Sequence, residues 1–217
     1  MHGNKVVLDL EFTPVTHPDL QDTAGNEIIE IGAVKLGTHN ELIEEFQTYV
    51  KPKYSCILPR ITRITNITNE TVEFAPDFET ATRAFTEWIG ETKKTQFYTW
   101  SGADQPVIQR EAEMKEFPLH PMFYTHWIDL QRIHQRLYRF QKPMNLTVAL
   151  GSMQIYFEGL EHGALADARN TAKILHTLSD VKGTICQRHG ARISYNNPCE
   201  YGILMEFVFR KKSTSRK

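Results

Sequence analysis

The chain has 217 residues, of which 41% are hydrophobic and 24% charged, and its net charge is −1 with histidine neutral. This composition predicts one soluble globular domain with a complete core, and no apolar run approaches the roughly 18 residues of a membrane-spanning helix. The near-zero charge argues against a protein that coats long duplex DNA by neutralising phosphates. The short basic tail at residues 210–217 is expected to be a solvated terminus.

Three strands are predicted in the first fifty residues. Residues 5–12 and 27–36 are apolar runs, and a Gly-Thr-His-Asn turn at 37–40 leads into a third run at 42–50. Short links between successive strands predict an antiparallel meander. The period then changes, with Pro76 near a helix start. Spacings of three and four define the apolar stripe of this helix: Phe78, Ala81, Phe85 and Ile89.

The next part of the chain is one strand followed by helices. Residues 95–100 predict a fourth strand, and a helix is expected to start near Ala103. Further helices are expected over three segments: 127–140, 145–154 and 162–180. Asn145 is a candidate N-cap for the second of these. The last carries an apolar stripe: Leu165, Ala168, Ala172 and Leu175.

This order of elements predicts an α/β domain with a central mixed sheet flanked by helices. The fourth strand would lie beside the first, reached through the crossover helix, which leaves residues 5–12 in the centre of the sheet. After Gly183 the character changes, and residues 191–197 and 201–209 predict two strands around an Asn-Asn-Pro turn. These strands would form an added C-terminal hairpin.

The three cysteines, Cys56, Cys186 and Cys199, are odd in number and irregularly spaced. The N-terminal segment has an early acidic pair and no long apolar stretch, so no signal peptide is predicted. Reduced thiols in a cytosolic protein are therefore expected. A zinc site built from Cys186, His189 and Cys199 would lack a clear fourth ligand and is not expected.

Two carboxylates stand in the first predicted strand. Asp9 and Glu11 are two residues apart in "VVLDLEF", so their side chains point to the same face, about 6–7 Å apart along the strand. Buried carboxylates are costly unless they are paired or bind a metal, so such a pair in a central strand requires cations. The alternative is that residues 6–12 form an edge strand with one solvated face.

Two further acids favour the metal interpretation. Asp104 follows "TWSGA" at the end of the fourth strand, and Asp167 lies in the first turns of the last helix. Each has an ordinary explanation, because Asp104 could cap its helix and Asp167 could lie on a solvated face. Four acids that converge on one place would instead suit hard ions, Mg²⁺ or Mn²⁺. Two such ions, roughly 3.5–4 Å apart, are the usual device for in-line attack on a phosphodiester.

His162 completes the candidate site. It lies five residues before Asp167, next to Gly163, and its titration range suits a general base near neutral pH. Seven other histidines are expected to be structural or surface residues: His17, His39, His120, His126, His134, His176 and His189.

The ordered set of "DLE" at 9–11, Asp104 within "GADQPVIQRE" and "HGALADA" at 162–168 resembles the three exonuclease motifs of the DEDDh (DnaQ-like) family, over roughly residues 5–180. "EIIEIGAV" and "ITNITNETVEFAPDF" resemble family segments between the first two motifs. "YTWSGAD" and "ADARNTAKIL" resemble the Eri-type and KapD-like branch. The chain departs from that branch at Ala166, where an Asp is usual, and in the Ser-Gly-Ala run before Asp104. The catalytic set is complete despite these departures.

The resemblance implies a ribonuclease H-like fold with a five-stranded sheet. It also implies a 3′–5′ exonuclease that releases nucleoside 5′-monophosphates from RNA or DNA with a free 3′ end, in a single strand or an overhang. Because the character of the sequence changes after Gly183, we expect an exonuclease domain at 1–182 and a C-terminal extension at 183–217, either in the same domain or as an appendage. The cofactors implied are two divalent ions, Mg²⁺ or Mn²⁺.

The resemblance also assigns roles to individual residues. Asp9, Glu11 and Asp167 would hold one ion, Asp9 would also reach the second, and Asp104 would support that second site. His162 would be the general base. Backbone groups of Phe12 and Thr13 would meet the terminal nucleotide, and Phe12 could also pack against its base or sugar. Ordinary core packing is the alternative for Phe12.

Other functions on the same fold remain open from the sequence. The chain could be a catalytically idle regulator that binds nucleic acid or protein, or a proofreading subunit that acts beside a polymerase. The preference for RNA or DNA depends on contacts to the 2′-hydroxyl that the sequence does not locate. Asp129 is expected to cap a helix rather than act as a fifth acid. An arginine stripe could follow phosphates or form a solvated face: Arg132, Arg136 and Arg139.

Overall fold

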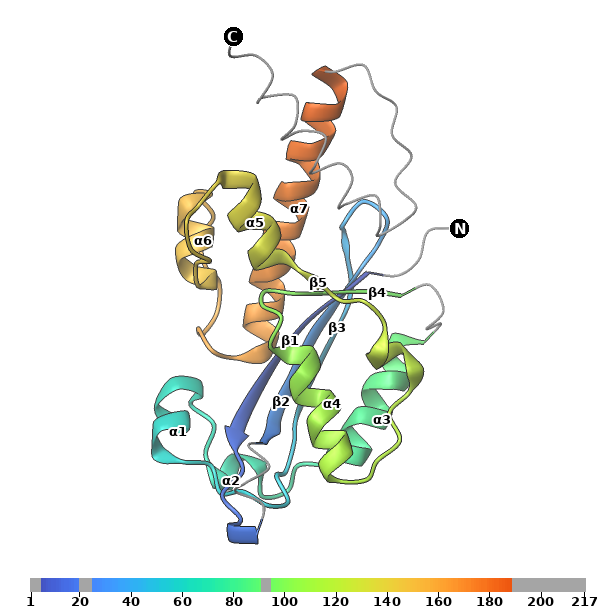
Figure 1. The fold of residues 1–217 in the computed structure, drawn as a ribbon, viewed down its shortest axis with the longest axis vertical. Coiled ribbons are helices and arrows are strands. Elements are labelled where there is room, and N and C mark those ends of the chain that lie inside the picture. The colour runs from blue at the N-terminus through green and yellow to red at the C-terminus, as the bar shows by residue number, and fades with distance from the viewer. Residues whose placement is uncertain (1–4, 20–24, 91–94, 189–217) are drawn as a thin grey trace. The chain divides into compact units, whose positions relative to one another are not determined.

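A computed structural model describes residues 5–19, 25–90 and 95–188, with side chains up to residue 179. A five-stranded sheet with the strand order β3-β2-β1-β4-β5 organises this part of the chain (Figure 1). Its strands are β1 (Lys5–Pro14), β2 (Asn26–Leu36), β3 (Leu42–Tyr49), β4 (Gln96–Thr99) and β5 (Ile128–Asp129). The first three form an antiparallel meander, and β4 and β5 add in parallel. The predicted α/β fold, mixed sheet and central first strand are confirmed.

The helices include those predicted from the apolar periods and three short ones that were not predicted. They are α1 (Pro59–Thr65), α2 (Asn69–Val72), α3 (Phe78–Ile89), α4 (Asp104–Met114), the 3₁₀ helix η3 (Pro121–Tyr124), α5 (Leu130–Tyr138), α6 (Leu146–Ser152) and α7 (Ala164–Arg188). The three that were not predicted are α1, α2 and η3. Asn145 caps α6 as predicted, its side chain accepting a hydrogen bond from the Val148 N–H. The predicted helix at 127–140 is wrong at its start, because Ile128 and Asp129 pair with β4 before Asp129 caps α5.

The alternation of side chains along β1 separates two apolar layers. Val6 and Leu8 point into the layer that contains Phe85 of α3 and Ile108 of α4. Val7 points to the opposite face, into the layer formed with α5, α6 and α7. Asp9 and Glu11 continue the series of Val7, so both acids lie on the face of the sheet that α7 covers.

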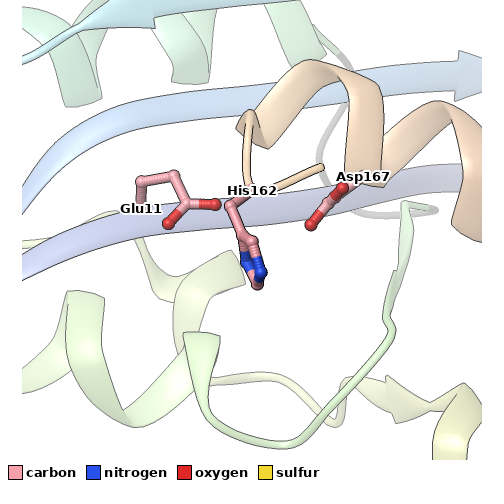
Figure 2. A group of neighbouring side chains, drawn as sticks. All are labelled: Glu11, His162 and Asp167. Carbon is pink, nitrogen blue, oxygen red and sulfur yellow. The ribbon is translucent and has the colours of Figure 1, made fainter. Parts of the chain in front are cut away.

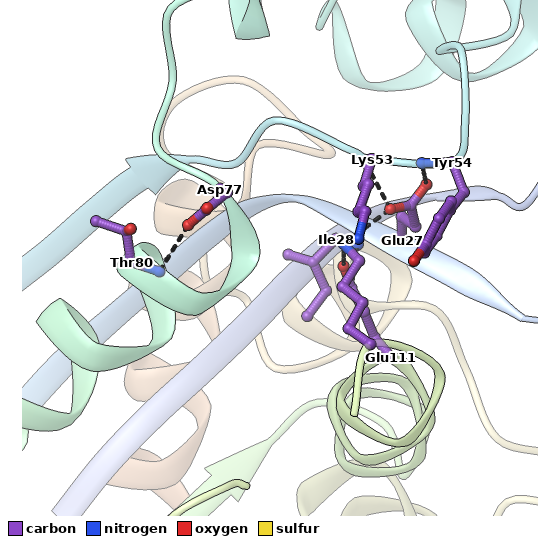
Figure 3. A network of polar contacts seen from close by, with 8 residues as sticks. Glu27, Ile28, Lys53, Tyr54, Asp77, Thr80 and Glu111 are labelled. Atoms are coloured by element: carbon purple, nitrogen blue, oxygen red, sulfur yellow. Dashed lines mark hydrogen bonds and ion pairs between the residues drawn. The ribbon is translucent and has the colours of Figure 1, made fainter. Parts of the chain in front are cut away.

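A buried polar network fixes the beginning of β2 (Figure 3). The Glu27 carboxylate accepts hydrogen bonds from the N–H groups of Lys53 and Tyr54, at 2.7 and 2.8 Å. Glu111 of α4 accepts from the Ile28 N–H at 2.7 Å. Lys115 lies between the two carboxylates, 2.8 Å from Glu27 and 2.6 Å from Glu111. Strand β2 is thus anchored to α4 and to the segment after β3.

The chain divides into one compact unit that ends at Leu178 and a second that begins at Ser179. The predicted hairpin at 191–209 lies outside the described residues, and so do the side chains of Cys186, His189 and Cys199. The division at 182/183 therefore stays a prediction. Cys56 is exposed with a free thiol. Among the described helices, none combines the length and apolarity that crossing a bilayer requires.

Candidate active site

Strand β1 presents Asp9 and Glu11 to the face covered by α7. In the antiparallel register Asp9 lies opposite Gly32 of β2, and Glu11 lies opposite Glu30. Residues directly opposite in such a pair project to the same face, so three carboxylates and one glycine share this surface. A register shift follows Glu11, which marks the end of the regular pairing beside the acids.

Asp104 reaches this group of acids from the β4 edge of β1, which is opposite the edge that pairs with β2. The β1–β4 pairing covers only the first residues of β1, up to Val7 opposite Tyr98. Beyond that point β4 ends, and Oδ1 of Asp104 accepts the hydrogen bond of the Leu10 N–H at 3.2 Å. Asp104 is in the first turn of α4 and is 4% exposed. The carboxylate therefore takes the place of a missing strand partner.

The third motif closes the site. One ligand atom each of Glu11, His162 and Asp167 lies within 4.8 Å of the others (Figure 2). His162 is exposed and has a left-handed backbone with φ of 60°. Asp167 lies in the first turn of α7, where its N–H donates to the Gly163 carbonyl at 2.9 Å. The predicted convergence of the first and third motifs is thus present in the structure.

Asp9 and Asp104 lie outside this set of three but belong to the same electrostatic cluster. Burial, followed by the charge of Asp104, raises the pKa of Asp9 well above its ordinary value. Burial and the charge of Asp167 raise the pKa of Glu11 to about 9. Burial likewise raises the pKa of Asp104 and of Asp167, each to about 7. The charged neighbours that raise these pKa values are themselves carboxylates.

This cluster has the chemistry of a divalent-ion site. Oδ1 of Asp167 is buried and has no hydrogen-bond partner, which is costly for a carboxylate unless a cation binds it. Crowded carboxylate oxygens suit hard ions such as Mg²⁺ or Mn²⁺. A bound cation would also reverse the upward pKa shifts, since it favours the ionised acids.

Comparison with known proteins agrees with the geometry. The family model described as "RNase_T: Exonuclease" matches residues 6–175. The chain belongs to this exonuclease family. It is 33% identical over 190 residues to human ERI1 exoribonuclease 2, covering 77% of this chain and 27% of that protein. It is 28% identical over 171 residues to the Drosophila melanogaster 3′-5′ exonuclease Snipper, covering 69% of this chain and 59% of that protein.

Solved structures share the fold. The nuclease domain of 3′hExo, described as a DEDDh family member bound to rAMP, superposes with a TM-score of 0.70 and 23% identity over 82% of this chain and 92% of that one. The family and fold predicted from the three motifs are confirmed. Nucleases of this family use divalent metal ions. The chain spans only a part of the curated relatives named above, about a quarter of the human one.

Two of the residues predicted to meet substrate have structural contacts. The Thr13 side chain is fully buried, and its hydroxyl donates to the Cys56 carbonyl at 3.5 Å. The Phe12 ring is partly buried against the core under α3 and α4. Contact of their backbone groups with a nucleotide stays a prediction.

The weaker sequence signals have simple outcomes in the structure. Asp129 caps α5 as predicted, its Oδ1 accepting from the Arg132 N–H at 2.9 Å. Arg132, Arg136 and Arg139 are exposed, as the solvated-face interpretation expects. Their contact with phosphates stays a prediction.

Two buried polar residues beside the site were not recognised from the sequence. Glu30 is 2% exposed and faces the cluster from β2. Asn170 is fully buried on α7 and exchanges two hydrogen bonds with the backbone of Glu158, four residues before His162. For Glu30 a signal was available in the sequence, because it is an acid within the apolar run "EIIEIGAV", as Asp9 is within its own run.

Proposed function

We propose that this chain is a 3′–5′ exonuclease that hydrolyses phosphodiester bonds of single-stranded nucleic acid and releases nucleoside 5′-monophosphates. The observation that carries the proposal is the convergence of Glu11, His162 and Asp167 within 4.8 Å, beside Asp9 and Asp104. A histidine beside crowded carboxylates combines a proton acceptor with a site for divalent ions. Membership of the exonuclease family supports this reaction class.

Each residue has a defined part in the proposed reaction. Asp9, Glu11 and Asp167 would hold one ion, with Asp9 and Asp104 serving a second. When bound, the ions would neutralise charge on the phosphate and make water a better nucleophile. The imidazole of His162 would take the proton of the attacking water. Its exposed position on the loop before α7 leaves the ring accessible to solvent and substrate.

RNA is the substrate class that we propose. Relatives that match over most of this chain are named exoribonucleases, and a structural neighbour was solved with rAMP. A protein distinguishes RNA from DNA through contacts to the 2′-hydroxyl. RNA should therefore be degraded faster than a DNA oligonucleotide of the same sequence.

Digestion of 5′-labelled RNA and DNA oligonucleotides with Mg²⁺ or Mn²⁺ tests the proposal. A ladder that shortens from the 3′ end, with 5′-monophosphate products, is the expected result. Substrates with a blocked 3′ end and circular single strands should resist. Efficient cutting of circles would indicate an endonuclease. Binding without any digestion, equal in the wild type and Asp167→Asn, would instead indicate the idle regulator.

A further inference from the structure

The first turn of α7 lies directly on the backbone of β2. Gly32 has no side chain, and a Cβ atom at this position would overlap the backbone of Ala164 and Leu165. Gly32 is opposite Asp9 in the β1–β2 register. The close approach therefore brings the start of the helix, and Asp167 on its first turn, to the strand position that carries the metal-site acids.

A carboxylate from the sheet caps this helix. Oε2 of Glu30 accepts a hydrogen bond from the Ala164 N–H at 3.0 Å, across 134 residues of sequence. The N–H groups of a first helical turn have no partner within the helix, and Gly163, which precedes it, has no side chain to supply one. The negative charge of a carboxylate also suits the positive end of the helix dipole.

Glu30 is itself held in a defined position. Its second oxygen, Oε1, accepts from the side-chain amide of Gln47 on β3 at 2.6 Å. Gln47 lies opposite Gly32 in the β2–β3 register, on the same face of the sheet. The carboxylate is thus fixed between the edge strand and the helix, and its rotamer does not depend on a bound ion.

The position of Glu30 beside the other acids is electrostatically unfavourable, so its hydrogen bonds must account for it. The charge of Glu30 contributes to the raised pKa values of Asp9, Glu11 and Asp167. A carboxylate buried beside three other carboxylates makes each of them harder to ionise when no cation is present. Its two hydrogen bonds account for where it lies, and one of them is to the helix that carries Asp167.

We propose that Glu30 is a positioning residue of the exonuclease site. Its hydrogen bond to the Ala164 N–H fixes the start of α7 on β2, and this sets Asp167, and His162 on the preceding loop, against Glu11. Glu30 would act through the helix and would not touch substrate. The inference rests on the proposed function in taking Asp167 as a metal ligand.

Two substitutions at one position test this role. Glu30→Ala removes the acceptor, and we expect Mn²⁺ affinity and kcat to fall about 10–100-fold, the usual effect of losing a residue that orients metal ligands. KM for the oligonucleotide should change much less. Glu30→Gln keeps an oxygen that can accept from the Ala164 N–H, and it should restore most of the affinity and rate.

Hydrogen exchange gives a readout that needs no activity. In Glu30→Ala, the amides at the start of α7 should exchange faster than in the wild type, while those of β1 should not. Glu111→Gln is the control, since Glu111, like Glu30, is a buried glutamate whose carboxylate accepts a hydrogen bond from a distant backbone N–H, here that of Ile28 on β2. This control should lower the melting temperature and leave Mn²⁺ affinity of the folded protein unchanged.

Three results would overturn the role of Glu30. These are wild-type Mn²⁺ affinity in Glu30→Ala, unchanged exchange at the start of α7, or a loss in Glu30→Gln as large as in Glu30→Ala. Mn²⁺ affinity and exchange are measured without substrate. A wild-type protein that binds Mn²⁺ but digests nothing would therefore count against the proposed function and leave the test of Glu30 intact.

Discussion

The backbone N–H of Leu10 donates a hydrogen bond to Oδ1 of Asp104, 94 residues later in the chain. The bond continues the edge of β1 where β4 has ended, so Asp104 has both a structural and an electrostatic role. These two roles can be separated by substitution, because only one of them needs the charge.

Asp104→Asn should keep the bond to Leu10 and lose the charge. We expect near-native stability with reduced Mn²⁺ affinity and rate. Asp104→Ala should in addition leave a buried N–H without a partner, which costs about 1–3 kcal/mol of unfolding free energy. Urea denaturation and Mn²⁺ titration of both variants check this. Equal stability of the two variants would show that the Leu10 bond contributes nothing.

The parts of the fold that sequence could predict are those encoded locally. The meander, α3 and α7 follow from runs and stripes of adjacent residues, and the Asp-x-Glu and His-x₄-Asp spacings state the chemistry within a few residues. The convergence of these motifs was predictable because a central strand and a late helix have few ways to meet.

The parts that sequence did not predict depend on contacts between distant segments. The bond from Ala164 to Glu30 spans 134 residues, and no local pattern records it. Strand β5 has only two residues, Ile128 and Asp129, which is too short to show a period, so it was absorbed into the following helix. Helices α1 and α2 were also missed, with seven and four residues. Helix α6 is as short as α1, but Asn145 marks its start, whereas Leu58 before α1 gives no such signal.

Metal-free protein should lose stability as pH rises. Burial raises the pKa of Asp104 and Asp167 to about 7 and of Glu11 to about 9, above the values of the unfolded chain. Between about pH 4.5 and 9 the folded state therefore binds more protons than the unfolded state, so its unfolding free energy falls with pH. Melting temperatures in EDTA across this range check the prediction.

Adding Mn²⁺ should reverse the trend. Metal ligands must be deprotonated, so binding becomes tighter with pH and the stabilisation by Mn²⁺ should grow from pH 5 to pH 8. Asp167→Asn serves as the control, because it removes a ligand and one of the buried charges. A melting temperature that rises with pH in EDTA would contradict the assignment of these acids as a crowded, cation-requiring cluster.

Lys115→Met should destabilise the fold without altering the chemistry. Lys115 is 6% exposed between the carboxylates of Glu27 and Glu111. Burial raises the pKa of Glu111 to about 7. At Glu27 burial is outweighed by the hydrogen bonds from Lys115, Ser55 and the Lys53 N–H together with the charge of Lys115, so the pKa of Glu27 is lowered. Removing the Lys115 ammonium leaves both buried acids without its charge, at a cost of about 3–5 kcal/mol.

Urea denaturation of Lys115→Met measures that cost. Arg132→Met is a surface control, since the Arg132 side chain is 71% exposed in its pair with Asp129 and such pairs contribute about 0–1 kcal/mol. The folded fraction of Lys115→Met should keep wild-type kcat. A cost no larger than that of the control would mean that the network is solvated.

Asn170→Ala should impair catalysis by releasing the loop that carries His162. The Asn170 amide bonds both backbone groups of Glu158, at 3.1 and 2.9 Å, and also donates to the Ala166 carbonyl at 2.8 Å. Losing these bonds frees the segment before His162, and misplacement of a reacting group by about 1 Å can cost 10²-fold in rate. Single-turnover kinetics should show a lower rate.

Lys173→Ala is the control for Asn170→Ala. Lys173 pairs with the exposed Glu158 carboxylate at 3.0 Å and also donates to Oδ1 of Asn170 at 3.2 Å and to the Tyr156 carbonyl at 3.3 Å. Its substitution leaves the three bonds from Asn170 to Glu158 and Ala166 in place, so the loss of rate should be smaller than in Asn170→Ala. Mn²⁺ affinity should be near that of the wild type in both variants, because Asp167 stays on α7. If the two variants lose equal rate, the amide of Asn170 does not hold the loop.

His162→Asn is the sharpest test of the proposed general base. His162 has a left-handed backbone, and Asn is among the residues that tolerate this conformation best, so the loop should keep its shape. An amide cannot accept the proton of the attacking water near neutral pH, and the single-turnover rate should fall by roughly 10²–10⁴-fold. Because His162 lies within 4.8 Å of Glu11 and Asp167, it could instead act as a metal ligand. Mn²⁺ affinity separates the two roles. If His162 is only the base, His162→Asn should bind Mn²⁺ about as tightly as the wild type, and if His162 is a ligand, the variant should bind Mn²⁺ more weakly. A normal rate with a depressed melting temperature would remove His162 from the mechanism altogether.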